Sequence, residues 1–305
     1  MNTRTRNQII QQKRRRINFF TVITIVLILI LAFVLISCKD DSSQTGQEPS
    51  GTNSRQNAPD DSTNEASKKF SDIYYYESDN AKRYEAYWKG HGDMSMEDVV
   101  WQVNASLDQE RYEDYDEVQI DDVDDLLVLV NKYHKLPESY EPTDLVEVGA
   151  DIKMRSEAAN AYKKMSSQAE SEDINFIPQS GYRSYSYQEW LYNNYKKSDP
   201  KGADTYSARP GFSEHQTGLA LDINVPSGGD LHNFDDTEQA KWVSKNAHKY
   251  GFIVRYTEAN QDITGYINEQ WHIRYIGEKH AQNMYDKKIG SYEEYKVKYI
   301  DHTPS

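Results

Sequence analysis

The chain has 305 residues, a formal net charge of −14 at pH 7 and a single cysteine. Its acidity disfavours nucleic acid as a partner, and a lone cysteine excludes any intramolecular disulfide. Six Lys or Arg and no acidic residue fall within residues 1–38, so the rest of the chain is still more acidic. We interpret this charge mainly as a solubilising surface.

Residues 1–38 combine a basic stretch, from Arg4 to Arg16, with an apolar run from Ile17 to Ile36. Basic residues before an apolar stretch favour a cytoplasmic N-terminus, which places the following chain outside the membrane. The run ends at Cys38, in a string that resembles the lipobox of bacterial lipoproteins, whose cysteine is lipidated. The alternative is an uncleaved anchor, because about 20 apolar residues span a bilayer. Both predict the extracytoplasmic face of a bacterial cell membrane.

Two segments separate this anchor from the main domain. Residues 39–69 are rich in Ser, Thr, Asn, Gln and Gly and predict a disordered linker. Residues 70–125 are acidic and Tyr-rich and predict a partly helical appendage, because Ser95 precedes apolar residues at helical spacing. The tyrosines at 74–76 could stack on sugars, but packing against the main domain is the simpler interpretation.

Residues 126–300 are expected to form the main domain, with an α+β fold. A helix is predicted where Met154, Ala158, Ala161, Tyr162 and Met165 recur at helical spacing. A second is predicted over 237–250, followed by strands at 251–256 and near 271–276. Helices and strands are partly segregated along the chain, which favours α+β.

Four residues in two short strings carry the chemistry: His215 and Asp222, then Glu269 and His272. Two histidines and one carboxylate are the ligand set of a hydrolytic zinc centre, which leaves a position open for water. The second carboxylate can then act as a base. Asp222 could instead cap a turn, but an acid in an apolar strand is costly unless it is paired or bound to metal.

Four motifs follow one another along the chain: Ser180-Gly181-Tyr182-Arg183-Ser184, Gln188, Ser213-x-His215-x-x-Gly218-x-Ala220-x-Asp222 and Glu269-x-Trp271-His272. Their order and spacing resemble the VanY-type D-alanyl-D-alanine carboxypeptidases, which are related to VanX dipeptidases and to peptidoglycan L,D-carboxypeptidases. The resemblance covers about residues 126–277 and implies a zinc peptidase domain, with a small central antiparallel sheet flanked by helices.

The resemblance implies a role for each matching residue. His215, Asp222 and His272 would bind Zn²⁺, and Glu269 would move the proton of the attacking water. Arg183 would face the developing oxyanion or hold a substrate carboxylate, since a planar guanidinium suits either task. Gln188 and Ser213 are candidates for substrate hydrogen bonds, on the analogy with the family alone.

One geometric expectation follows from the spacing of Glu269 and His272. On a regular strand, residues three apart face opposite sides of the sheet, so both can reach one metal only if a bulge or turn intervenes. The remaining histidines are interpreted as ordinary surface or core residues: His91, His134, His232, His248, His280 and His302.

The sequence therefore predicts a surface-anchored zinc carboxypeptidase that removes terminal D-alanine from peptidoglycan stem peptides. Of the two possible activities, we favour D,D cleavage of the pentapeptide over L,D cleavage of the tetrapeptide. An endopeptidase and a catalytically silent wall-binding module are the alternatives; a carboxylate clamp at Arg183 argues against the first, and Glu269 against the second. Gln270 and residues 257–260 depart from the family pattern, but these departures leave every candidate ligand in place.

Overall fold

A computed structural model describes residues 69–112, 120 and 122–302 of the chain. These residues belong to one compact unit. The predicted membrane segment, Cys38 and nearly all of the predicted linker lie outside the described residues. Within the described ranges, no helix has both the length and the apolar character needed to cross a bilayer.

The centre of the fold is a four-stranded antiparallel sheet in the order β3-β4-β6-β5. Its strands are β3 (Ile177–Ser180), β4 (Ala220–Asn224), β5 (Phe252–Tyr256) and β6 (Glu269–Tyr275). A separate antiparallel pair is formed by β1 (Leu145–Gly149) and β2 (Ile152–Arg155). The small antiparallel sheet expected from the sequence is confirmed.

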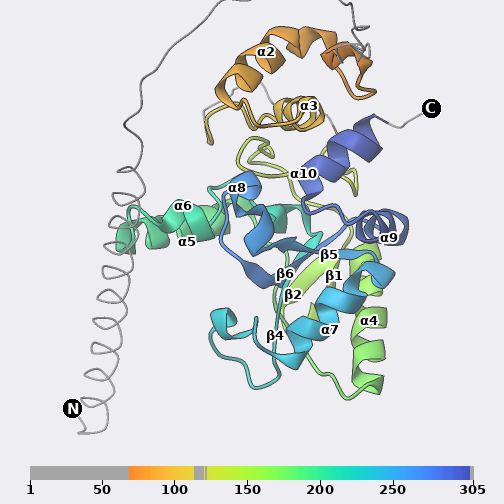
Figure 1. The fold of residues 1–305 in the computed structure, drawn as a ribbon. Helices are drawn as coiled ribbons and strands as arrows, with labels where there is room; N and C mark the ends of the chain where they lie inside the picture. Colours follow the sequence, from red (N-terminus) through yellow and green to blue (C-terminus); the bar gives the residue numbers. More distant parts are fainter. Residues whose placement is uncertain (1–68, 113–119, 121, 303–305) are drawn as a thin grey trace, which may run out of the picture. The chain divides into compact units, whose positions relative to one another are not determined.

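Helices surround this sheet, so the α+β class is also confirmed. Figure 1 shows α4 and α7 on one side of the four-stranded sheet and α5 and α6 on the other. The α-helices are α2 (Ala81–Gly90), α3 (Met96–Asn104), α4 (Ser156–Ser171), α5 (Tyr185–Ser198), α6 (Ala203–Tyr206), α7 (Glu238–Asn246), α8 (Gln261–Thr264), α9 (Glu278–Asp286) and α10 (Tyr292–Tyr295). Short 3₁₀ turns include η3 (Glu214–Thr217), η4 (Leu231–Asn233), η5 (Ala247–Tyr250) and η6 (Glu258–Asn260), and a π-helical turn, η7 (Lys296–Asp301), follows α10.

The main hydrophobic core lies between α4, α7 and one face of the sheet. Alternate residues of the central strands point into it, among them Leu221 and Ile223 of β4 and Ile273 of β6. The residues between them, including Asp222 and His272, therefore face the opposite side of the sheet. This alternation separates the core from the functional residues.

Two predicted helices are confirmed, with one change of boundary. Helix α4 buries Ala158, Ala161, Tyr162 and Met165 on one face, as their spacing predicts. Met154 was expected in the same helix but lies in β2, where it pairs with β1. The second helix begins after the Thr237 cap and passes through η5 to Gly251, whose φ of +84° ends it.

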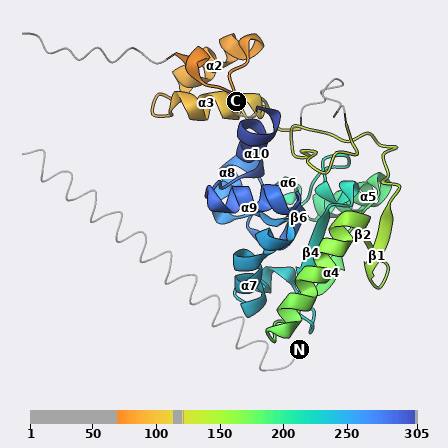
Figure 2. The same ribbon diagram turned by 90° about the vertical axis from the view of Figure 1, so that its right-hand side faces the viewer.

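Residues 70–107 form a hydrophobic cluster of their own, built on α2 and α3 and completed by Val297 from η7. The Ser95 hydroxyl caps α3 by accepting a hydrogen bond from the Asp98 amide, as predicted. Tyr75 is buried in this cluster, and the Tyr74 hydroxyl donates to the Lys298 carbonyl at 2.6 Å. Figures 1 and 2 show α2 and α3 beside α10. The packing role expected for the tyrosines is confirmed for Tyr75.

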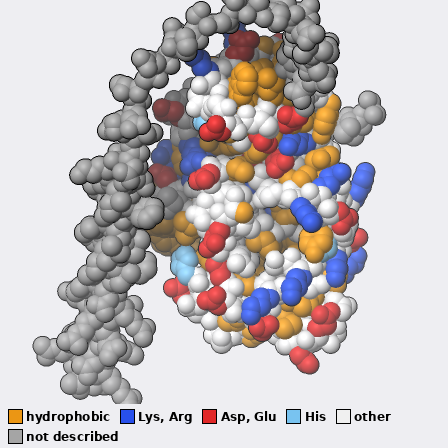
Figure 3. Space-filling view, in the orientation of Figure 1, with side chains coloured by type: hydrophobic (Ala, Val, Ile, Leu, Met, Phe, Trp, Pro, Cys, Tyr) orange, Lys and Arg blue, Asp and Glu red, His pale blue; other side chains and the backbone are white. Residues whose placement is uncertain are grey.

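The described surface carries charges of both signs. In the space-filling view of Figure 3, acidic and basic side chains are interspersed with apolar ones over the visible face. A mixed surface of this kind is typical of a protein exterior in contact with water.

Candidate metal centre and active site

The centre of the site is a cross-strand pair in the sheet. Asp222 of β4 lies directly opposite His272 of β6 in the antiparallel register. Directly opposed residues have Cβ atoms about 4.5–5.5 Å apart, so strand pairing alone brings these two side chains together. Both are buried on the face of the sheet that points away from the main core.

The third residue, His215, arrives on the short turn η3, immediately before β4. Its Nδ1 lies 2.7 Å from the carbonyl oxygen of Gly181, in the segment after β3. Gly218 closes the turn in the left-handed conformation, with φ +67°, and turns the chain into β4. A 3₁₀ turn tied to the neighbouring strand thus aims the imidazole at Asp222.

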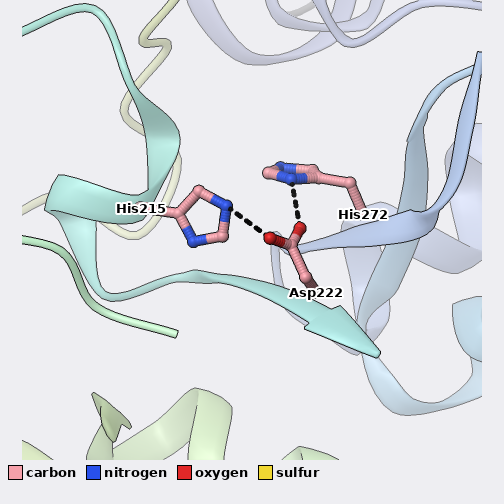
Figure 4. Close-up of side chains that lie close together, drawn as sticks. All are labelled: His215, Asp222 and His272. Carbon is pink, nitrogen blue, oxygen red and sulfur yellow. Dashed lines mark hydrogen bonds and ion pairs between the residues drawn. The ribbon is translucent and has the colours of Figure 1, made fainter. Parts of the chain in front are cut away.

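Together the three side chains form a compact cluster, which Figure 4 shows in close-up. Each oxygen of Asp222 faces one histidine: Oδ1 lies 3.0 Å from Nδ1 of His272, and Oδ2 lies 3.3 Å from Nε2 of His215. The candidate ligand atoms all lie within 4.8 Å of one another, and all three residues are buried. A single ion could contact all three.

The far nitrogen of each imidazole also has an oxygen partner. For His215 this is the Gly181 carbonyl, and for His272 it is Oε2 of Glu214, 3.2 Å from Nε2. Metal-binding histidines characteristically donate their second ring N–H to a carbonyl or carboxylate, which fixes the tautomer and the ring orientation. The donor set and its partners therefore fit zinc, with Nε2 of His215 and Nδ1 of His272 facing the ion.

The electrostatics of the cluster are consistent with a cation site. Burial, followed by the neighbouring Arg183, lowers the pKa of His215 to about 4, so this ring is neutral at pH 7. Burial opposes ionisation of Asp222, but His215, His272 and Arg183 outweigh it and hold its pKa well below the ordinary value. Burial would also lower the pKa of His272, yet its contacts with Asp222 and Glu214 raise it to about 9. Metal binding must then displace a proton from His272.

Glu269 reaches the same site through an irregularity in β6. Val254 pairs with Ile273, but the next registered pair is Tyr256 with Glu269, so β6 holds two extra residues between them. This bulge lies where the spacing of Glu269 and His272 required one, and that prediction is confirmed. Glu269 lines the same cavity as His215, Asp222 and His272.

Burial raises the pKa of Glu269 to about 8, and the charge on Asp222 contributes in the same direction. Because the pKa of Glu269 is higher in the folded than in the unfolded protein, protonation of this carboxylate stabilises the folded state. This stabilisation is complete below the unfolded pKa of about 4.5 and is lost as the pH rises through the folded pKa of about 8. In chelator-treated protein, Glu269→Gln should therefore raise the melting temperature above that of the wild type at pH 9. The advantage should shrink as pH falls towards 5. Thermal unfolding over this range measures it.

The exposed Glu258 provides the control, since Glu258→Gln changes only a solvent-exposed side chain and should melt as the wild type does at pH 9. Equal melting temperatures for Glu269→Gln and the wild type at pH 9 would mean that burial of this carboxylate costs the metal-free protein nothing.

Arg183 lies against the metal cluster rather than free in the cavity. Its guanidinium donates to Oδ2 of Asp222 at 2.7 Å through Nη2 and to the Ser180 hydroxyl at 2.8 Å through Nε. The third nitrogen, Nη1, makes a long contact of 3.5 Å with Oε1 of Gln188. Arg183 also lines the cavity. Its guanidinium is held in place by Asp222 and Ser180, and Nη1, which makes only the long contact with Gln188, can bind an incoming ligand.

The two candidates for substrate contacts also line this cavity. Gln188 is 1% exposed, and its amide nitrogen donates to the Ala208 carbonyl at 2.7 Å. This contact anchors the neighbouring chain segment. Ser213 is 4% exposed and precedes η3 without capping it through its side chain.

Three residues near the site had not been singled out from the sequence. Glu214 contacts His272, and the ring of Tyr256 lies 4.9 Å from that of His272. His232, expected to be an ordinary histidine, lines the cavity and packs edge-on against Trp271 at 5.1 Å. Glu214 adjoins His215 in sequence, which is the one signal that could have indicated it.

The turn that carries His215 depends on glycine at position 218. A Cβ there would lie 2.9 Å from Cδ2 of Leu145 and 3.3 Å from the Arg155 nitrogen. Gly218→Ala should lower the free energy of unfolding by about 1–3 kcal/mol, because it adds steric conflict to a left-handed backbone. Denaturant unfolding measures the change.

Gly228→Ala is the matched control, because Gly228 has a similar φ of +65° but open space around it. Apart from its chain neighbours, no atom of the described residues lies within 4 Å of the place that an alanine Cβ would take. Gly228→Ala should cost less than Gly218→Ala. Equal losses would show that close packing at Gly218 contributes nothing beyond its backbone conformation.

Comparison with known proteins agrees with this geometry. The family model described as VanY, D-alanyl-D-alanine carboxypeptidase, matches residues 151–278. YodJ of Bacillus subtilis (strain 168), named as a carboxypeptidase, is 41% identical over 214 residues, which are 64% of this chain and 78% of YodJ. VanXYC of Enterococcus gallinarum, a bifunctional D-Ala-D-Ala dipeptidase and D-Ala-D-Ala carboxypeptidase, is 34% identical over 55% of this chain and 94% of its own length. The solved LdcB LD-carboxypeptidase is 41% identical with a TM-score of 0.54, over 58% of this chain and 88% of LdcB.

Proposed function

Because the chain belongs to the VanY family of D-alanyl-D-alanine carboxypeptidases, which are zinc metallopeptidases, we propose that it removes the C-terminal D-alanine from peptidoglycan stem peptides. The observation that carries this proposal is the buried His215, Asp222 and His272 cluster, with Glu269 and Arg183 on the wall of the same cavity. D,D cleavage of the pentapeptide is the activity that the family's description suggests.

L,D cleavage of the tetrapeptide is the second candidate, and a specific observation favours it. LdcB, an LD-carboxypeptidase, is 41% identical to this chain, whereas VanXYC, a D-Ala-D-Ala dipeptidase and carboxypeptidase, is 34% identical. The two activities differ in the chirality of the residue before the scissile bond. Side chains on the cavity wall must distinguish them, so L,D cleavage stands beside D,D cleavage as an outcome of the same test.

The chemistry assigns each residue a distinct task. Zinc held by His215, Asp222 and His272 would lower the pKa of water towards 7 and polarise the scissile carbonyl. Glu269 would accept a proton from the attacking water and pass it to the departing amine as the C–N bond breaks. The products are free D-alanine and a stem peptide one residue shorter.

Arg183 would act on the substrate through its cavity-facing edge. Its contacts with Asp222 and Ser180 fix the guanidinium plane before any ligand arrives. A preorganised cation at this position can hold the substrate's terminal carboxylate or stabilise the developing oxyanion. The carboxylate task favours cleavage at the C-terminus of a peptide over internal cleavage.

The test compares two synthetic stem peptides, one ending in D-Ala-D-Ala and one in a single D-Ala, with zinc-loaded full-length protein in detergent. Mass spectrometry identifies the products. Release of D-alanine from the pentapeptide alone supports D,D specificity, and release from the tetrapeptide alone supports L,D specificity. If neither peptide is cut, or if Glu269→Gln cuts as fast as the wild type, the proposed function is wrong.

We also propose that the enzyme acts at the extracytoplasmic face of a bacterial cell membrane. The basic stretch, the apolar run and Cys38 of the first 38 residues support this location. Mass spectrometry of the mature N-terminus tests it. A lipid-modified Cys38 supports a lipoprotein, an intact N-terminus supports an uncleaved anchor, and release of unmodified protein from the cell contradicts both.

A further inference from the structure

A set of fully buried charged side chains adjoins the metal cluster behind His272. The carboxylate of Glu214 uses its two oxygens for different partners. Oε2 lies 3.2 Å from Nε2 of His272, while Oε1 accepts from Nε of Arg255 at 2.8 Å. Oε1 also lies 3.3 Å from Nη1 of Arg274. The side chains of Glu214, Arg255 and Arg274 have no solvent exposure.

A second glutamate balances the charge of this group. Glu293 of α10 accepts two hydrogen bonds from Arg255, at 2.7 and 3.0 Å, and one from Asn131 at 3.1 Å. Arg255 donates to Glu214 through Nε and to Glu293 through its two terminal nitrogens, and it is Glu214 that contacts His272. Buried ion pairs gain little over apolar packing, because desolvation offsets their attraction. Stability alone therefore does not account for Glu214.

The donors around Glu214 determine which way each hydrogen bond runs. Guanidinium groups only donate, so Oε1 is held as the acceptor of Arg255. Oε2, which is also an acceptor, then requires Nε2 of His272 to carry its proton. In a neutral imidazole with a proton on Nε2, the lone pair lies on Nδ1. Nδ1 is the nitrogen that faces Asp222 and the position for the ion.

We propose that Glu214 is a positioning residue that holds His272 in the Nε2–H tautomer and so presents Nδ1 to the metal. This inference rests on the zinc site of the proposed function, but not on the identity of the peptide substrate. Glu214 is the neighbour of His215 in the sequence, but the residue that it positions is His272. The turn η3 and the strand β6 bring Glu214 and His272 within contact distance.

Glu214→Gln tests the proposal because it changes charge and donor pattern with little change of shape. The amide oxygen should turn towards Arg255 and Arg274, which leaves the amide N–H₂ facing Nε2 of His272. A donor at this position favours the opposite tautomer, with the proton on Nδ1. The dissociation constant for zinc should then rise about 10–100-fold, the usual cost of losing an outer partner of a metal ligand.

The measurement is competition for zinc between a chromophoric chelator and the full-length protein in detergent, with circular dichroism to verify folding. Glu293→Gln is the matched control, since it also leaves Arg255 short of one buried negative charge. Its zinc affinity should stay within about threefold of the wild type, because no partner of a metal ligand is lost. Equal losses in the two variants, or a wild-type affinity in folded Glu214→Gln, would overturn the proposal.

A second measurement requires no variant and remains decisive if Glu214→Gln fails to fold. Long-range ¹⁵N–¹H correlation spectra of zinc-loaded, ¹⁵N-histidine-labelled protein report the tautomer of each ring. We expect the proton of His272 on Nε2 and that of His215 on Nδ1. A proton on Nδ1 of His272 would overturn the proposal. Failure of the wild type to bind zinc at all would instead contradict the proposed function.

Discussion

Replacing Glu269 by glutamine should lower kcat by about 10²–10⁴-fold, the usual contribution of a positioned general acid–base group. Glutamine fills the same space on the cavity wall but can neither accept the proton of the attacking water nor return it to the leaving amine. Zinc should remain bound, because Glu269 is not one of the three clustered ligands. Stopped and continuous assays of D-alanine release, with zinc quantified in the same samples, measure both effects.

The kinetic pattern distinguishes proton transfer from substrate binding. Removing a group that acts only in the transition state lowers kcat and kcat/KM by the same factor, whereas removing a group that only binds substrate raises KM. Glu258→Gln, at an exposed position of the turn η6, should turn over as the wild type does. A rise in KM with unchanged kcat would show that Glu269 binds substrate and that the base lies elsewhere.

The second large effect is expected at Asp222, where asparagine should weaken zinc binding by more than the roughly 100-fold upper limit for loss of an outer partner. The two oxygens of Asp222 contact His215, His272 and Arg183. Asparagine offers one oxygen and one N–H₂ group, so it must present a donor either to Arg183 or to a histidine. Peptidase activity should be lost with the metal. Chelator competition and zinc content after dialysis measure the effect.

Asp230→Asn is the matched control for this variant. Asp230 also lines the cavity, but its carboxylate caps η4 by accepting from the His232 amide. Its substitution should leave zinc affinity unchanged, because no ligand atom is altered. If Asp222→Asn kept a wild-type zinc affinity, the metal would have to be held by other residues of the cavity.

Much of the fold was predictable because its elements have local signals. The spacing of Ala158, Ala161, Tyr162 and Met165 predicted a helix, since each turn of a helix returns side chains to the same face. Ser95 and Gly251 marked a beginning and an end through their capping geometry. Met154 was assigned to a helix wrongly, because helical spacing and strand pairing cannot be told apart over so short a stretch.

The candidate site was predictable in its members but not in its arrangement. His215, Asp222, Glu269 and His272 stand in strings whose residue types suit a hydrolytic zinc centre. Even the bulge before His272 could be inferred, because two residues three apart had to face one metal. Such inferences need only the chemistry of the side chains and the period of a strand.

Tertiary structure alone decided which partner each of these residues has. The pairing of Asp222 with His272 depends on the register of β4 against β6. The contact of Arg183 with Asp222 and the contact of Glu214 with His272 join residues 39 and 58 positions apart. The sequence by itself determined the ligands, the base and the class of chemistry, because these depend on side-chain type and local spacing. The tautomer of each histidine, the charge balance around Glu214 and the lining of the cavity depend on contacts between segments far apart in the sequence. Only the packing of the folded chain sets these contacts.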